Sequence, residues 1–176
     1  ITAAYELVQD EAALQNWVDQ AKEAGIVAVD TETTSLDAMQ AELVGLSLSV
    51  QAGKACYIPL AHKTASSQVA LDLGDGGDVE AEEAPQQIPR QKALDILTPL
   101  LDDLSVLKVG QNIKYDALIL SRYGVAMTPV DDTMLLSFVL DGGLHGHGMD
   151  VLADTHLGLS TVKYKDVVGT GKKQIT

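Results

Sequence analysis

Two acidic side chains, two residues apart, are the first feature of this sequence that could do chemistry. Asp30 and Glu32 follow the apolar run 26–29, whose β-branched residues predict a buried strand. Because side chains alternate across a strand, both carboxylates should lie on one face. Adjacent carboxylates repel each other unless a cation lies between them, and hard ions such as Mg²⁺ or Mn²⁺ prefer oxygen ligands. The alternative interpretation of this Asp-x-Glu sequence is that both acids lie in a turn and face water.

A second pair of polar residues lies much further along the chain. Asn112 and Asp116 are four residues apart in a segment, 112–123, whose apolar positions have helical spacing. On a helix these two side chains would share a face. The segment directly follows an expected strand at 106–110, so a third carboxylate could converge on the same pocket. The alternative is a surface helix with a solvated aspartate.

The elements that must position these residues alternate between helix and strand. Helices are expected at 11–24, from Arg90 onward, and at 112–123, 133–140 and 151–157; strands are expected at 26–30, 43–50, 55–60 and 106–110. Gly25 should end the first helix, a short loop at 51–54 should form a hairpin, and Asp132 and Asp150 are expected N-caps. This order predicts one α/β domain over 1–176, with a mixed central sheet flanked by helices. We expect the ribonuclease H-like fold rather than a Rossmann fold, because no glycine-rich turn follows the first strand.

Composition limits the possible classes of protein. The chain has 176 residues and a net charge of −13, and its 46% hydrophobic fraction excludes wholesale disorder. No apolar run is long enough for a transmembrane helix. The acidity argues against binding nucleic acid by broad phosphate neutralisation, but not against nucleic acid held through metal ions.

Six acids and no base lie within 72–83, so segment 63–89 is expected to be a solvated surface excursion, with an acidic contact surface as the alternative. The single Cys56 is expected to be a buried structural thiol in a reducing, cytoplasmic protein.

Five segments occur in one order along the chain: 27–36, 43–47, 57–62, 107–116 and 132–135. Together they resemble the 3′→5′ exonuclease (proofreading) domain of bacterial DNA polymerase I. The resemblance implies that Asp30, Glu32 and Asp116 are catalytic metal ligands. It also implies that the residues binding substrate are Thr31, Leu36, Asn112, Tyr115 and Tyr164.

The same resemblance implies a mechanism and partners. Two divalent ions, Mg²⁺ or Mn²⁺, would support hydrolysis of the 3′-terminal nucleotide of a single-stranded or frayed DNA end. Leu36 and Tyr164 would stack on bases of any type. The partners would be the single-stranded 3′ end and a polymerase domain in the same parent chain, with no membrane. The family's third motif, Tyr-x-x-x-Asp, is absent; we expect it beyond Thr176, which would leave this fragment with weak activity or none.

Two other functions remain open at this stage. The chain could be an inactive exonuclease-like module that only binds DNA or supports a polymerase domain, or a relative of the ribonuclease D type acting on RNA. His145 and Asp150 have the His-x-x-x-x-Asp spacing of a sister exonuclease branch, but we interpret them as a loop residue and a helix cap. His145 and His147 are a weak candidate metal pair, because the sequence shows no third ligand nearby.

Overall fold

The computed structural model describes residues 3–63, 85–163 and 166–167. They belong to two compact units, residues 1–132 and 133–176, and each unit is described by itself. Most of the expected acidic excursion, residues 64–84, lies outside the described residues. The prediction of one domain spanning 1–176 stays a prediction.

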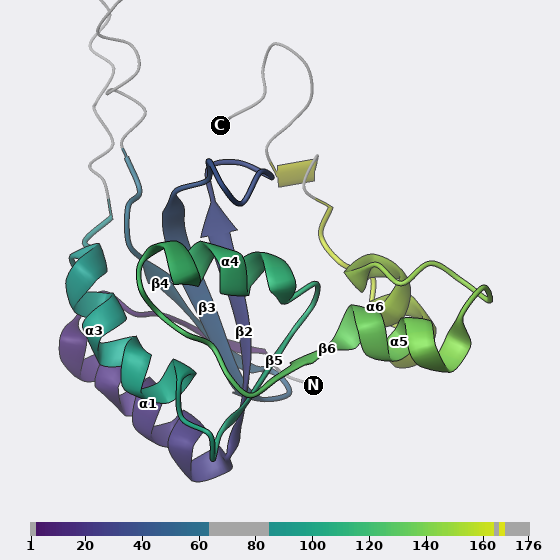
Figure 1. The fold of residues 1–176 in the computed structure, drawn as a ribbon, viewed down its shortest axis with the longest axis horizontal. Coiled ribbons are helices and arrows are strands. Elements are labelled where there is room, and N and C mark those ends of the chain that lie inside the picture. The colour runs from purple at the N-terminus through teal and green to yellow at the C-terminus, as the bar shows by residue number, and fades with distance from the viewer. Residues whose placement is uncertain (1–2, 64–84, 164–165, 168–176) are drawn as a thin grey trace, which may run out of the picture. The chain divides into compact units, whose positions relative to one another are not determined.

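The first unit is built on a six-stranded mixed sheet (Figure 1). Its strands are β1 (Ala4–Leu7), β2 (Ile26–Thr33), β3 (Leu43–Gln51), β4 (Lys54–Pro59), β5 (Leu107–Gly110) and β6 (Val130–Asp132). They lie in the order β1-β4-β3-β2-β5-β6. Strands β2, β3 and β4 are antiparallel neighbours, which confirms the expected hairpin, whereas β1 pairs parallel to β4 and β5 pairs parallel to both β2 and β6.

Among the described residues, three helices accompany this sheet: α1 (Glu11–Ala24), α3 (Arg90–Leu101) and α4 (Lys114–Arg122). Helices α1 and α3 pack side by side, and α1 also contacts β2 and β3 (Figure 1). The bounds of α1 are those predicted, because each end has a local signal. The Asp10 side chain accepts a hydrogen bond from the Ala13 amide at 2.9 Å, and Gly25 adopts the left-handed conformation that ends the helix, with φ 69°.

Strand β2 has one closed face and one open face. Val27, Val29 and Thr31 are buried, whereas Glu32 on the other face is exposed and Asp30 is half-buried. The buried valines join a core that includes side chains of α1, α3 and α4. The sheet therefore presents Asp30 and Glu32 on the face opposite to that core.

Lys108 on β5 is a fully buried cation that the sequence did not single out. Its ammonium group donates to the carbonyl oxygens of Asp103 at 2.8 Å, Val106 at 2.7 Å and Thr128 at 2.5 Å. Burial lowers the pKa of this lysine, and the charges of Asp103 and Asp102 oppose that shift. Because the carbonyl oxygens replace water around the ammonium, Lys108 ties the segment before β5 to the segment before β6.

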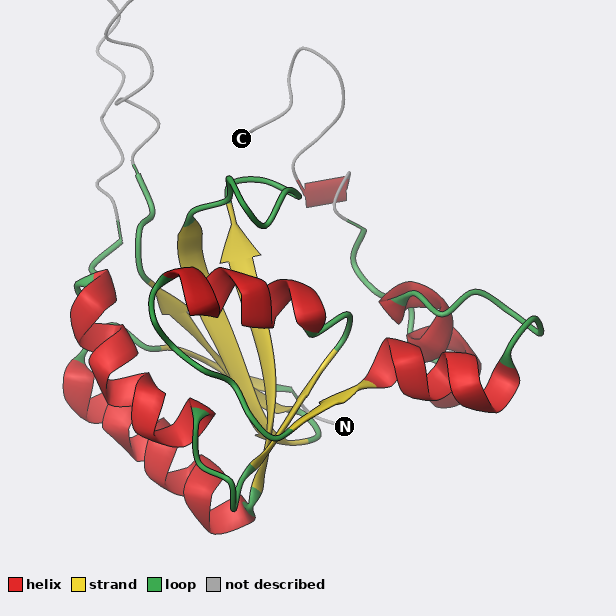
Figure 2. Cartoon of the chain, viewed as in Figure 1, coloured by secondary structure: helices red, strands yellow, loops and turns green. Residues whose placement is uncertain are grey.

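The second unit contains α5 (Thr133–Asp141) and α6 (Met149–Leu157), drawn in red with the other helices in Figure 2. The prediction that Asp150 caps the last helix was wrong. The helix begins at Met149 after Gly148, so Asp150 lies inside its first turn and accepts a hydrogen bond from the Thr161 hydroxyl at 2.5 Å. None of the helices in the described part of the chain combines the length and apolar character that a membrane span requires.

Candidate active site

The first pair of predicted carboxylates lies near the end of β2. In the ladder with β3, Asp30 is opposite Ser47 and Glu32 is opposite Gly45. Alternation along the strand places both carboxylates on the open face, as expected, and sends the Thr31 side chain to the closed face. The strand therefore presents two acidic groups beside each other where a ligand could reach them.

Asp116 is a buried carboxylate, only 2% exposed, which excludes the solvated aspartate considered as an alternative. It lies in the first turn of α4, which contacts β2. Its Oδ1 atom accepts two hydrogen bonds from Thr31, one from the backbone amide at 2.9 Å and one from the hydroxyl at 2.6 Å. The structure thus brings Asp116 to the residue between Asp30 and Glu32, although 85 positions separate it from Thr31.

The prediction that Asn112 and Asp116 share a helical face was wrong. Helix α4 begins at Lys114, and Asn112 precedes it with a left-handed backbone, φ 57°. The Asn112 side chain is exposed, whereas Asp116 is buried. Asparagine tolerates this conformation better than most residues, so the local geometry rather than helical spacing accounts for its position.

Asp132 positions the start of α4. Its two carboxylate oxygens accept hydrogen bonds from the backbone amides of Asn112 and Ile113, each at 3.0 Å. These two amides directly precede α4, and a negative charge at the N-terminal end of a helix is favourable. The sequence indicated Asp132 only as a cap for residues 133–140, because its pairing with this turn depends on the parallel alignment of β5 and β6.

The electrostatics of the site favour a cation. Burial raises the pKa of Asp30 to about 6, with further contributions from the negative charges of Asp116 and Glu32. Burial also raises the pKa of Asp116, and the hydrogen bonds from Thr31 oppose this shift. The charge of Asp132 adds to the shift of the Asp116 pKa, so both shifts reflect the cost of holding negative charges close together away from water. An all-carboxylate donor set of this kind fits a hard divalent ion such as Mg²⁺ or Mn²⁺.

Tyr115 and Thr33 hold the start of the loop that follows β2. Their hydroxyl oxygens are 2.5 Å apart, and the Tyr115 hydroxyl also donates to the Ser35 carbonyl. The next residue, Leu36, is 97% exposed. Two of the predicted substrate-binding residues are therefore neighbours, with Tyr115 supporting the backbone that presents Leu36.

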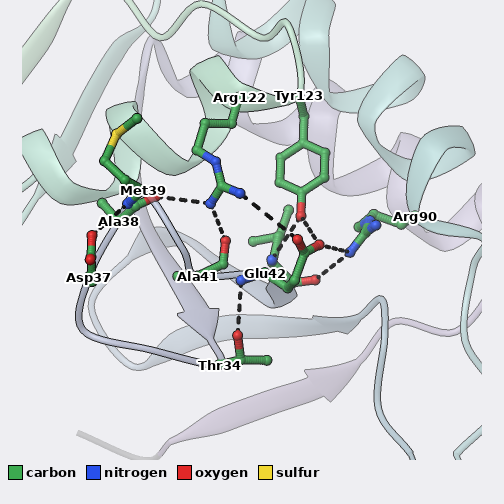
Figure 3. Close-up of polar contacts among 10 residues, drawn as sticks. Thr34, Asp37, Ala38, Met39, Ala41, Glu42, Arg90, Arg122 and Tyr123 are labelled. Atoms are coloured by element: carbon green, nitrogen blue, oxygen red, sulfur yellow. Dashed lines mark hydrogen bonds and ion pairs between the residues drawn. The ribbon is translucent and has the colours of Figure 1, made fainter.

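A second set of contacts, which we call the Glu42 clamp, holds the other end of this loop (Figure 3). Its side chains are Glu42, Arg90, Arg122 and Tyr123. The Glu42 carboxylate accepts a hydrogen bond from the Tyr123 hydroxyl at 2.9 Å and forms an ion pair with Arg90 at 3.3 Å. Arg122 donates to the carbonyl oxygens of Ala38, at 2.9 Å, and Ala41. The clamp therefore fastens the loop to α4, the helix that carries Asp116.

Tyr57 lies beside Glu32 and was missed as a separate site residue. Its hydroxyl oxygen would be 1.9 Å from a Cβ atom built on Gly45, the partner of Glu32, so only glycine leaves room for the ring. The Tyr57 hydroxyl is also 2.7 Å from the His62 Nε2 atom. Burial and the charge of Glu32 raise the pKa of Tyr57 to about 12. The segment 57–62 contained both residues, but spacing alone did not show that Tyr57 faces Glu32.

The remaining predicted residue cannot be placed. Tyr164 lies outside the described residues. Among the others, Thr31 joins the two carboxylate motifs, Leu36 and Tyr115 belong to the adjoining loop, and Asn112 precedes α4. The assignment of these residues to catalysis or substrate binding stays a prediction.

Comparison with known proteins connects this arrangement to a family. A family of 3′-5′ exonucleases matches residues 5–176. The chain is 48% identical to DNA polymerase I of Rhizobium leguminosarum over 183 residues, covering 99% of this chain and 17% of that protein. It is 42% identical to DNA polymerase I of Pseudomonas aeruginosa over 178 residues, covering 98% of this chain and 17% of that protein. The chain therefore spans 17% of the length of either relative.

A solved structure confirms the predicted ribonuclease H-like fold. Escherichia coli RNase D, an exoribonuclease involved in structured RNA processing, superposes with a TM-score of 0.63 at 16% identity, over 92% of this chain and 36% of that chain. At this identity the likeness concerns the fold alone. Because the family match extends over nearly the whole sequence, the chain belongs to the 3′-5′ exonuclease family.

Proposed function

We propose that this chain is a metal-dependent 3′→5′ exonuclease domain of a DNA polymerase I. Its substrate is the 3′-terminal nucleotide of a single-stranded or frayed DNA end, and its partner is a polymerase domain in the same parent chain. One observation carries the proposal. The buried Asp116 carboxylate is hydrogen-bonded to Thr31, which lies between the two acids of β2, so the motifs converge on one carboxylate site.

Asp30, Glu32 and Asp116 would hold two divalent ions, Mg²⁺ or Mn²⁺. Their donor chemistry fits, because burial and mutual repulsion raise the pKa of Asp30 and make an added positive charge favourable. When bound, such ions neutralise phosphate charge and activate water for hydrolysis. Thr31 orients Asp116 through two hydrogen bonds and so restricts where that carboxylate can bind a cation.

The loop beyond β2 would select the end of the DNA. Leu36 offers an exposed apolar side chain that can contact a base without reading its identity, which suits removal of any nucleotide. The Thr33–Tyr115 contact and the Glu42 clamp hold the two ends of this loop. An unpaired end reaches such a site more easily than a paired one, because fewer base pairs have to open. This difference would favour the excision of mismatched nucleotides.

The test uses the full-length protein and a labelled primer with a 3′ mismatch. Degradation should require Mg²⁺ or Mn²⁺, release nucleoside monophosphates and be lost in an Asp30→Ala, Glu32→Ala double variant. An Asp95→Ala variant on the exposed side of α3 is the control and should keep the activity. Wild-type degradation by the double variant would contradict the proposal. Primer binding without cleavage by the unaltered protein would favour the inert DNA-binding module, and degradation only of an RNA primer would favour the ribonuclease alternative.

A further inference from the structure

Three metal-ligating side chains meet in the second unit, within residues 133–176. Asp141 ends α5, His145 lies in the segment between the helices, and His156 lies in the last turn of α6. One ligand atom from each lies within 4.8 Å of the others. We propose that Asp141, His145 and His156 bind a divalent transition-metal ion, of which Zn²⁺ is the probe, at a site that shares no residue with the Asp30–Asp116 carboxylates.

The donor set distinguishes this site from the carboxylate site. Two imidazoles and one carboxylate suit Zn²⁺, Co²⁺ or Ni²⁺, whereas Mg²⁺ prefers oxygen ligands. Three protein ligands are also the number that leaves a fourth position of a tetrahedral ion open to water or another ligand. The two sites should therefore respond to different ions in the same solution.

The hydrogen bonding of His145 prepares one nitrogen for a metal. Its Nδ1 atom is 2.8 Å from the Gly146 carbonyl oxygen. A carbonyl only accepts hydrogen bonds, so Nδ1 carries the proton and the neutral ring has its lone pair on Nε2. That Nε2 atom is 3.7 Å from the Asp141 carboxylate. A backbone carbonyl that holds the second ring nitrogen is the usual support of a histidine metal ligand.

The geometry requires only small adjustments to close around an ion. The His145 and His156 ring centroids are 6.0 Å apart, and the rings are inclined at 76°. The side chains of His145 and Asp141 are 21% and 35% exposed, so an ion can enter from solvent while the ligands stay partly ordered by their surroundings. Rotation of the exposed His156 side chain can shorten the remaining distances.

A bound ion would contribute stability that this pair of helices otherwise lacks. Among the described residues, α5 has a single buried side chain, Ser137, and α6 has none. An ion ligated by Asp141 and His156 would link the end of α5 to the end of α6. Metal binding that requires folded geometry adds to the free energy of folding. The proposal is independent of the exonuclease function, because it concerns residues outside the carboxylate site.

The test is titration of the metal-free chain with Zn²⁺ in the presence of excess Mg²⁺, followed by calorimetry. We expect one Zn²⁺ equivalent whose affinity falls at least about tenfold in His145→Ala, His156→Ala and Asp141→Asn, a loss of about 1.4 kcal/mol or more. Co²⁺ should give the visible absorption of a nitrogen-ligated ion in the wild type and lose it in the histidine variants. Amide exchange in α5 and α6 should slow when Zn²⁺ is added.

Two further variants keep the proposal falsifiable. His147→Ala is the matched control from the same segment: His147 contacts the Ser137 hydroxyl at 2.8 Å and is outside the three-residue cluster, so Zn²⁺ affinity should persist. Asp30→Asn should also retain the Zn²⁺ equivalent. No binding by the wild type, binding unchanged in His156→Ala, or binding lost in His147→Ala or Asp30→Asn would each overturn the proposal, and none of these results bears on primer degradation.

Discussion

Asp116 and Thr31 are joined by two hydrogen bonds to a single oxygen: the Thr31 amide and hydroxyl both donate to Asp116 Oδ1, at 2.9 and 2.6 Å. This contact fixes a buried carboxylate of α4 against the strand that carries Asp30 and Glu32. It also limits the cost of burying Asp116, because two donors replace part of its lost hydration.

The first prediction concerns that hydroxyl. Thr31→Val keeps the shape of the side chain and removes one donor, so the free energy of unfolding should fall by about 1–3 kcal/mol. Mg²⁺-dependent cleavage of a mismatched primer should also slow, because Asp116 loses part of its orientation. Urea denaturation and cleavage rates measure the two effects. Thr98→Val, which removes a hydroxyl bonded to the Leu94 carbonyl within α3, is the control. Equal effects of the two substitutions on cleavage would contradict a positioning role for Thr31.

The second prediction concerns the repulsion among the carboxylates. In metal-free solution near neutral pH, Asp30→Asn removes one of the negative charges that face Asp116 and Glu32. The variant should therefore unfold at a higher temperature than the wild type in EDTA, with a gain on the order of 1–3 kcal/mol. With saturating Mg²⁺ the wild type should instead unfold at the higher temperature, because only the wild type gains stability from the ion. Thermal denaturation with and without Mg²⁺ checks both signs, with exposed Asp95→Asn as the control. A variant that is less stable than the wild type in EDTA would count against the repulsion argument.

The third prediction concerns pH and Cys56, which is 3% exposed. Burial raises the pKa of its thiol from 9.0 to about 12. The folded chain therefore holds this proton more tightly than the unfolded chain, and the contribution of Cys56 to stability should decline as the pH rises from about 9 to about 12. Denaturant titrations over this range should show a steeper decline for the wild type than for Cys56→Ala.

The same thiol offers a simpler measurement. Because the chain has one cysteine, a thiol reagent reports on Cys56 alone. Near pH 8 the folded protein should react at least about a hundredfold more slowly than the protein in denaturing urea, since both access and thiolate formation are suppressed. Comparable rates in the two conditions would show that Cys56 is not protected by the core.

The fourth prediction concerns the Glu42 clamp. The Tyr123 hydroxyl donates to Glu42 and accepts a hydrogen bond from the Leu43 amide at 3.0 Å. Tyr123→Phe removes both contacts, so amide exchange in the loop 34–42 should accelerate on the order of tenfold. If the clamp helps to present Leu36, the KM for a mismatched primer should rise more than kcat falls. Tyr5→Phe, at an 80% exposed position, is the control and should leave exchange unchanged.

The sequence was informative where the signal is local. The apolar spacing within 11–24 and Gly25 predicted the bounds of α1 to the residue, because the apolar face lies within the segment and the glycine directly follows it. The hairpin of β3 and β4 was equally predictable from a short loop between two apolar runs. Strands β1 and β6 were missed. All four residues of β1 are exposed and β6 has three residues, so both depend on pairing with β4 and β5 rather than on an apolar pattern.

By itself, the sequence determined that Asp30 and Glu32 share one face of a strand, because the period of a strand is two residues. It could not determine that Asp116 meets Thr31, that Tyr57 faces Glu32, or that Lys108 is enclosed by carbonyl oxygens. Nor could it bring His156 to Asp141 and His145. Each of these contacts joins separate segments, and only the packing of strands and helices in three dimensions decides which side chains become neighbours.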